Sequence, residues 1–396
     1  VDGNGSVVFK GVRLPCREVP ATVEFSAYAF NGDRVKSATV RRLHQVGPST
    51  SRPHRRAYVV SIGVNVCDDP GLTLRFAVND AVKLSRVITD LLSGTEEYEK
   101  VVAIPLVADD PVESAATKAD IRTVLMLLAG KQVSSAAAER IPNASQIRPS
   151  LPDDLVVITF SGHGYADGSG NFYLVPSDTG PHARSRIAAL GGGRLEELPD
   201  ATRRSIGDTL SRCISSDELS LWLRDVDAGN MTMIIDACQS AALTGKGFKP
   251  GPMGSRGLGQ LAFDKRMKIL AATQADNVAL EVAKLEHGLM TYILLNEGIE
   301  AGLADFSPRD STIFLGELLR YAGERVPALH LEIASGRIST TGKTRPRIMV
   351  RGLVRDRDRG LGLAPSGRSL QKPALFDFSA GASDTLLMRR RVRPEP

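Results

Sequence analysis

The stretch Leu155-Val-Val-Ile-Thr-Phe-Ser-Gly-His-Gly164 decides the fold that this sequence predicts. It begins as an apolar run rich in β-branched side chains and then changes abruptly to small and polar residues, as a buried parallel strand does at a sheet edge. The stretch Met231-Thr-Met-Ile-Ile-Asp-Ala-Cys-Gln-Ser240 has the same pattern. Because ligands bind beyond the carboxyl ends of strands in open α/β sheets, we expect His163 and Cys238 to face one another there.

A cysteine and a histidine placed together form a thiolate nucleophile and its acid–base partner. Taken singly, a buried cysteine usually behaves as a small apolar residue, and a lone histidine is more often structural than catalytic. Here both residues follow nearly identical strand signals, and both have small neighbours that let a substrate backbone approach closely. The sequence therefore predicts a catalytic dyad of His163 and Cys238.

The motifs around this pair resemble those of the caspase-like cysteine peptidases, and more closely the bacterial and metacaspase branches than the animal caspases. The resemblance extends over residues 55–350 and rests on Gly63-Val-Asn65, Asn79-Asp-Ala81, Ser161-Gly-His-Gly164, Asp236-Ala-Cys-Gln-Ser240 and His287-Gly-Leu-Met-Thr-Tyr292. The dyad residues are 75 positions apart, whereas caspases separate them by roughly 50. We attribute the extra length to a polar, glycine-rich surface loop around residues 191–193.

The resemblance implies an α/β fold with a mostly parallel six-stranded sheet flanked by helices. It also implies a cysteine endopeptidase with an acyl-enzyme mechanism. Cys238 attacks the scissile carbonyl, and His163 protonates the leaving amine and then activates water. The backbone amides of Gly164 and Cys238 form the oxyanion hole in this interpretation.

Three further positions match the metacaspase pocket that accepts arginine or lysine. They are Asp80, Ser161 and Asp236, so we expect cleavage after Arg or Lys. A carboxylate attracts a cation by about 4 kcal/mol at about 4 Å in the illustrative Coulomb limit. Asp80 also has a simpler explanation, because an acidic residue at a helix N-terminus is stabilised by the helix dipole.

Self-cleavage is predicted in residues 244–260, which are rich in glycine and proline and begin close to the nucleophile. Because this segment has almost no apolar periodicity, we expect it to be mobile and to form no regular structure. Lys246 and Arg256 fit the expected specificity, and their high effective concentration at the site favours an intramolecular cut. The alternative is a loop that stays whole.

Composition is that of an ordinary soluble protein. The chain has 396 residues, of which 42% are hydrophobic, and a formal net charge of +5. Basic and acidic residues are mixed, so we expect no nucleic-acid partner. The four cysteines show no metal or disulfide spacing, which indicates a reducing, cytoplasmic location. Asp167 and Asp178 resemble part of the calcium site of many metacaspases, but two carboxylates are fewer than the roughly 6–8 oxygen ligands that calcium prefers, so we expect no metal and no other cofactor. Because no apolar run reaches the length of about 18 residues, we expect no membrane span.

Four regions follow from the pattern along the chain. Residues 1–46 alternate apolar and polar side chains and predict a small antiparallel β module, which is either a packing unit or the end of a larger domain. Residues 47–56 predict a linker. Strand signals at residues 57–64, 101–107, 155–160, 231–235, 267–273 and 345–350 alternate with helix signals at residues 76–92, 118–128, 217–226, 289–300 and 313–326. This alternation assigns residues 57–350 to the peptidase domain, and residues 351–396 are assigned to a charged C-terminal extension.

The expected substrate is a protein or peptide with a basic residue before the cut, in regulated proteolysis, bacterial defence or cell death. We expect control by an activating protein partner or by a sensor region preceding Val1. Two alternatives remain open. One is a catalytically inactive caspase-like scaffold that binds partners. The other is a serine hydrolase, although Phe160-Ser-Gly162 contains only part of the Gly-x-Ser-x-Gly turn that such an enzyme needs.

Overall fold

The computed structural model places most of the chain. It describes residues 6–16, 20–29, 31, 35, 37–48, 54–110, 115–167, 171–190, 194–239, 255–272, 280–282, 287–334, 348–350, 373–379 and 384–389. The fold is α/β, with a mixed, mostly parallel central sheet flanked by helices and a small separate antiparallel sheet. The predicted α/β class is confirmed at this level.

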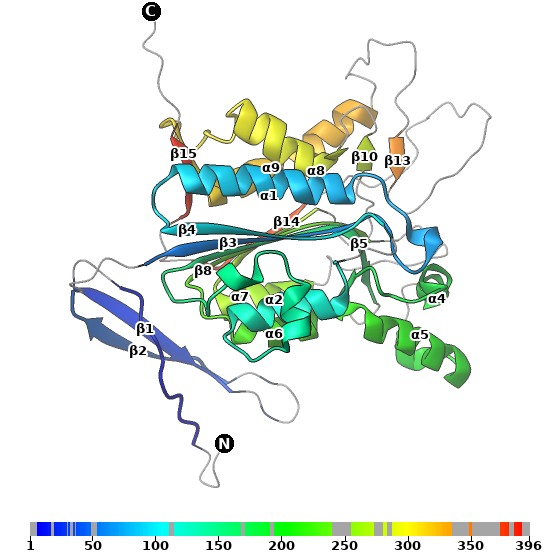
Figure 1. The fold of residues 1–396 in the computed structure, drawn as a ribbon, viewed down its shortest axis with the longest axis horizontal. Helices are drawn as coiled ribbons and strands as arrows, with labels where there is room; N and C mark the ends of the chain where they lie inside the picture. Colours follow the sequence, from blue (N-terminus) through cyan, green and yellow to red (C-terminus); the bar gives the residue numbers. More distant parts are fainter. Residues whose placement is uncertain are drawn as a thin grey trace, which may run out of the picture.

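Within the described residues, the central sheet has eight strands rather than the expected six, and six of them form the path β14-β9-β8-β5-β3-β4 (Figure 1). These strands are β3 Arg56–Val64, β4 Lys100–Ala108, β5 Leu155–Ala166, β8 Asn230–Gln239, β9 Lys268–Ala271 and β14 Ala374–Asp377. All neighbours on this path are parallel except β14 and β9, which are antiparallel. Two short strands, β6 Phe172–Val175 and β7 Ile214–Ser215, extend the sheet from β5.

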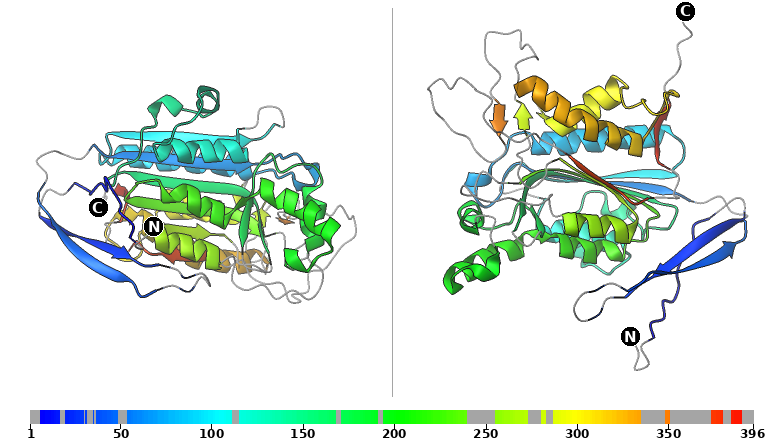
Figure 2. Two further views of the ribbon diagram at one scale, coloured as in Figure 1. Left: turned by 90° about the horizontal axis from the view of Figure 1, so that it is seen from below. Right: turned by 180° about the vertical axis from the view of Figure 1, so that it is seen from behind.

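Helices cover both faces of this sheet, as the opposite views of Figures 1 and 2 show. One layer contains α1 Ala77–Gly94, α8 Leu289–Tyr292, its π-helical continuation Ile293–Glu300 and α9 Leu315–Ala334; the other contains α2 Lys118–Leu128, α6 Ser216–Arg224 and α7 Ser255–Lys265. Val59 packs in the same apolar cluster as Ile88 of α1, whereas Val60 packs with Val124 of α2. Because both faces are buried, the strands are continuous apolar runs.

Further elements lie at the ends of the sheet. A short helix, α3 Ser135–Glu139, and the 3-10 turn Ala144–Gln146 lie between α2 and β5 in the chain. Helices α4 Ala183–Leu190 and α5 Asp200–Arg212, joined through the 3-10 turn Leu195–Glu197, occupy the segment that was expected to be a surface loop. That expectation is therefore wrong for residues 183–190 and 195–212, while residues 191–193 lie outside the described part of the chain.

The N-terminal antiparallel sheet is confirmed as a pair of strands, β1 Ala21–Ala27 and β2 Val40–Val46. Residues 6–9, which also alternate in polarity, form no strand. In Figure 1 this pair lies near the beginning of β3, far from α4 and α5. The boundaries at residues 46, 56 and 350 remain predictions.

The chain after residue 350 contributes strands to the body of the protein. β14 forms the sixth strand of the central path, and β15 Leu386–Arg389 pairs with β12 Thr312–Phe314. In contrast, β13 Ile348–Val350, which the sequence favoured as a final strand, pairs with β10 Leu280–Val282. β10 also pairs with β11 His287–Gly288, so these three strands form a separate small sheet.

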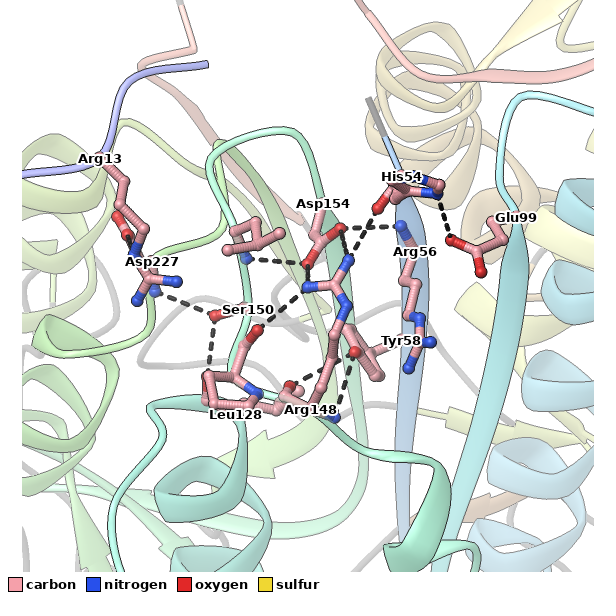
Figure 3. A network of polar contacts seen from close by, with 12 residues as sticks. Arg13, His54, Arg56, Tyr58, Glu99, Leu128, Arg148, Ser150, Asp154 and Asp227 are labelled. Carbon is pink, nitrogen blue, oxygen red and sulfur yellow. Dashed lines mark hydrogen bonds and ion pairs between the residues drawn. The ribbon is translucent and has the colours of Figure 1, made fainter. Parts of the chain in front are cut away.

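A buried carboxylate ties together the amino ends of the central strands (Figure 3). Asp154 is fully buried and accepts two hydrogen bonds from Arg148, at 2.8 Å from Nη1 and 3.0 Å from Nη2. It also accepts from the backbone amides of Arg56 and Leu151, at 2.7 and 2.8 Å. This ionised side chain is therefore fully hydrogen-bonded, as a buried charge must be.

Across the described ranges, no helix has both the length and the apolar character needed to cross a membrane.

Candidate active site

The register of two neighbouring strands brings the predicted dyad positions together. His163 of β5 is the ladder partner of Cys238 of β8, and Ser161 is the partner of Asp236 two residues earlier. Paired residues of parallel strands project to the same face of a sheet, and so do residues two apart in one strand. The backbone therefore sets all four positions on one face.

Helix α1 covers that face closely. Gly63 of β3 is the ladder partner of Ser161, and a Cβ on Gly63 would lie 2.8 Å from the Ala81 Cβ and 2.9 Å from the Ala77 carbonyl oxygen. Only a residue without a side chain allows α1 to approach the sheet this closely. The sequence motif around Gly63 thus has a packing reason, which brings the N-terminal half of α1 next to Ser161.

His163 is held by a backbone carbonyl. Its Nε2 lies 2.8 Å from the carbonyl oxygen of Leu72, and its side chain is only 2% exposed. A carbonyl oxygen only accepts, so Nε2 carries a proton. In the neutral ring, Nδ1 is then the nitrogen that can accept one. The Leu72 carbonyl is a part of the site that the sequence pattern did not reveal.

The expected exposure of His163 is wrong. The strand signal predicts that β5 ends at Phe160, before a solvent crevice, but β5 continues to Ala166. His163 pairs there with Val175 of β6 as well as with Cys238. The histidine therefore lies within a paired strand near the carboxyl end of the sheet, not beyond its edge.

Both predicted oxyanion-hole positions lie on these neighbouring strands. Gly164 follows His163 and is the ladder partner of Gln239, which follows Cys238. A Cβ on Gly164 would lie 2.9 Å from the Phe172 ring and 3.2 Å from the Ala237 Cβ. Glycine is thus required here by packing, independently of any role in binding a substrate.

The two acidic residues of the predicted pocket are both buried. Asp80 is fully buried on α1, and its Oδ1 lies 2.8 Å from Nδ1 of His287, while its Oδ2 accepts from the Gly288 amide at 3.0 Å. Asp236 is 1% exposed, and its Oδ2 accepts from the Thr291 hydroxyl at 3.3 Å. Residues 287–291 therefore contact both carboxylates.

Ser161, the third pocket residue, is 1% exposed, and among the described residues its hydroxyl has no hydrogen-bond partner. An unsatisfied buried hydroxyl is costly, so the position favours a polar group that completes its hydrogen bonds. The structure thus brings Asp80 and Asp236 to one segment and sets Ser161 beside Asp236 in the ladder.

His287 is a second residue that sequence reasoning left without a role. It bridges Asp80 and Lys83, because its Nε2 lies 3.1 Å from the Lys83 Nζ. The ammonium group donates to this nitrogen, so the ring donates from Nδ1 to Asp80. The only signal in the sequence is the His287-Gly288 pair within the late motif, and its partner is 207 positions away.

Two of the other cysteines lie in surroundings that disfavour a thiolate. Burial raises the pKa of the Cys67 thiol to about 11 and the pKa of the Cys213 thiol to about 12. Both residues are therefore neutral thiols at physiological pH and poor nucleophiles. Cys16, a third free cysteine, is partly exposed at a distance from the dyad in the chain.

Only one of the two predicted self-cleavage positions lies in the described part of the chain. Lys246 lies outside the described residues. Arg256 lies in the first turn of α7, so the expectation that residues 244–260 form no regular structure is wrong from Ser255 onward. Leu258 of that turn is fully buried. Within the ranges that the structure describes, no cluster of three His, Cys, Asp or Glu side chains has the geometry to hold a metal ion.

No family model matches the chain, and no curated protein gives a significant match to it.

Proposed function

We propose that the protein is a cysteine endopeptidase of the caspase-like type, with Cys238 as nucleophile and His163 as its acid–base partner. The observation that carries the proposal is the ladder pairing of these two residues on β5 and β8. Neighbouring strands lie about 4.8 Å apart. Side chains that start from paired positions on one face are within reach of a proton transfer.

The hydrogen bond between His163 and Leu72 supports the direction of that transfer. With Nε2 donating to the carbonyl at 2.8 Å, Nδ1 accepts the proton of the Cys238 thiol. The thiolate attacks the scissile carbonyl, and the imidazolium then gives its proton to the leaving amine as the peptide bond breaks. Water, deprotonated by the same nitrogen, hydrolyses the thioester and regenerates the thiol. The backbone amides of Gly164 and Cys238 stabilise the oxyanion.

Specificity for arginine or lysine before the cut is supported by Asp80 and Asp236. Both carboxylates are buried, and both contact residues 287–291. A carboxylate oxygen can accept more than one hydrogen bond, so Asp80 can bind a guanidinium while it keeps its hydrogen bonds to His287 and Gly288. A cationic side chain offsets the cost of burying two negative charges, whereas an acidic side chain adds to it.

The sheet supports the caspase-like assignment over a serine hydrolase. Its six-strand path is parallel except for the edge strand β14, as the resemblance implies. A serine nucleophile on this layout sits on a sharp turn between a strand and a helix. Ser161, in contrast, lies inside the paired strand β5.

This function is tested by hydrolysis of a peptide library in which the residue before the cut is varied over all amino acids. We expect turnover only after Arg or Lys, abolished in Cys238→Ala and in His163→Ala. Folding of each variant is checked by circular dichroism. A folded wild-type protein that cleaves no member of the library would favour the scaffold alternative, and cleavage after Asp would contradict the acidic pocket.

A further inference from the structure

The carboxylate of Asp69 joins the carbonyl that holds His163 to a helix outside the central sheet. Asp69 is 9% exposed and caps the 3-10 turn Pro70–Leu72. Its Oδ1 accepts from the Gly71 amide at 2.9 Å, and its Oδ2 accepts from the Arg184 amide of α4 at 2.8 Å. One side chain thus bridges the turn that ends at Leu72 and the beginning of α4.

Several contacts make this bridge stiff. The Leu72 amide donates to the Asp69 carbonyl at 2.9 Å, and Nη1 of Arg184 donates to the Gly71 carbonyl at 3.3 Å. A Cβ on Gly71 would lie 3.0 Å from the Asp69 Oδ1 and 3.1 Å from the Arg184 Cδ, so turn and helix fit closely. The turn has little freedom to move while both carboxylate oxygens of Asp69 keep their hydrogen bonds to the Gly71 and Arg184 amides.

Helix α4 is itself anchored to the strand that contains the histidine. Ile187 and Leu190 of α4 pack in a small apolar cluster with Ile206 and Leu210 of α5 and with Tyr165 of β5. Tyr165 is two residues beyond His163 in the same strand. The contacts therefore close a ring that runs from His163 through Leu72, Asp69 and α4 back to β5.

We propose that Asp69 is a positioning residue for the peptidase reaction: it holds the Leu72 carbonyl so that His163 keeps its proton on Nε2, and it makes that geometry depend on α4. This inference rests on the proposed function. Asp69 acts through the Leu72 carbonyl, the acceptor at His163 Nε2. In the opposite tautomer the proton is on Nδ1, the nitrogen that should receive one.

Three variants separate this role from a general effect on stability. Asp69→Asn keeps the shape but replaces one accepting oxygen by an amide group, which only donates. Asp69→Ser keeps a short N-cap acceptor for the turn, whereas its hydroxyl is too short to reach Arg184 as well. The matched control is Asp68→Asn, because Asp68 is exposed and its carboxylate accepts from the Gly180 amide at 3.0 Å rather than from the turn.

The experiment measures kcat and KM against pH for each variant, together with ¹⁵N spectra of the imidazole nitrogens. The His163 signal is assigned among the six histidines by its absence in His163→Ala. Small misplacements of catalytic groups cost about 100-fold in rate. We expect Asp69→Asn and Asp69→Ser to lower kcat by that order with KM nearly unchanged, and to convert the Nε2–H signal to a mixture of tautomers. The control keeps wild-type kcat and spectrum.

A single Nε2–H tautomer and wild-type kcat in folded Asp69→Ser would overturn the inference. If Asp69→Asn does not fold, Asp69→Ser alone decides it. The spectra need no substrate. A wild-type protein without turnover therefore overturns the proposed function, while the tautomer of His163 in the two Asp69 variants still decides whether Asp69 positions the ring.

Discussion

At the scale of single residues, the site consists of buried polar groups, and the free-energy cost of removing them from water must be offset by hydrogen bonds or ion pairs. Asp80, Ser161, His163 and Asp236 are each at most 2% exposed. Three of these groups have partners from distant parts of the chain: Leu72 for His163, His287 for Asp80, and Thr291 for Asp236. This cluster of buried polar groups differs from an apolar core, which excludes unmatched charge.

Asp236→Asn tests the acidic pocket. It retains the shape of the side chain but removes the charge that is expected to bind the guanidinium. Removing one partner of a buried charge pair costs at least about 2 kcal/mol, so kcat/KM for arginine substrates should fall by at least about 30-fold. The control is Asp90→Asn, because Asp90 is an exposed residue of α1 whose carboxylate pairs with Arg86. Equal losses in both variants would contradict the pocket.

The buried thiol of Cys67 makes stability depend on alkaline pH. Burial raises its pKa from 9.0 to about 11, so between these values the folded state keeps a proton that the unfolded state has lost. The neutral Cys67 thiol therefore contributes about 3 kcal/mol to the free energy of unfolding. This contribution is fully present below pH 9 and is lost as the pH rises through 11.

Urea unfolding between pH 8 and 11 measures this effect, in wild type and in Cys67→Ala. We expect the free energy of unfolding to fall less steeply with pH in Cys67→Ala. The matched substitution of the neighbouring, non-ionisable Val66→Ala should lower stability without altering the slope. An unchanged slope in Cys67→Ala would show that the thiol does not titrate in this range.

At the scale of elements, the parallel sheet is tied together at both ends. The carboxyl end contains the candidate site, and the amino end contains the network around Asp154 (Figure 3). Asp154→Ala leaves the Arg148 guanidinium and two backbone amides without their buried acceptor. Breaking a buried pair by removing one partner typically costs about 3–5 kcal/mol.

Chemical denaturation checks this estimate. The control is Asp200→Ala, which removes the exposed partner of Arg203 on α5 and should cost less than about 1 kcal/mol. A loss below about 1 kcal/mol for Asp154→Ala would show that the network contributes little. Peptidase activity per folded molecule should stay at the wild-type value, because the network lies at the other end of the strands.

Local signals in the sequence account for the elements that were predicted well. Helix α2 begins and ends at the predicted residues, Lys118 and Leu128, because its apolar periodicity is complete and Thr117 caps it. In α6, Ser215 forms the capping box with Glu218. These signals lie within a few positions of one another, so a single sequence is enough to find them.

The errors have a common physical cause in long-range pairing. β5 extends beyond Phe160 because β6 folds back on it, and β14 completes the sheet although it follows a long charged segment. The dyad, by contrast, could be proposed from sequence, since each residue follows its own strand signal. The partners Leu72 and His287 could not, because their contacts span 91 and 207 positions.

At the scale of the whole molecule, the same topology constrains self-cleavage. β8 and β9 are neighbours in the central sheet, so a cut between them leaves two fragments joined through the ladder. We expect the cut after Lys246 rather than after Arg256, because a cut at Arg256 requires the first turn of α7 to unfold. Intact-mass analysis of wild type, Lys246→Gln, Arg256→Gln and Cys238→Ala shows whether the chain is cut and after which residue. A cut that persists in Cys238→Ala would contradict self-cleavage.

The central claim is that the pairing of β5 and β8 makes Cys238 a nucleophile activated by His163. Covalent labelling with a peptide that carries a thiol-reactive group after a terminal arginine tests this most directly. Peptide mapping should find one adduct, on Cys238, which is absent in Cys238→Ala and forms far more slowly in His163→Ala. Cys67 and Cys213 should stay unlabelled because burial raises their pKa. No adduct on Cys238 of the folded wild-type protein, or equal labelling rates with and without His163, would contradict the account.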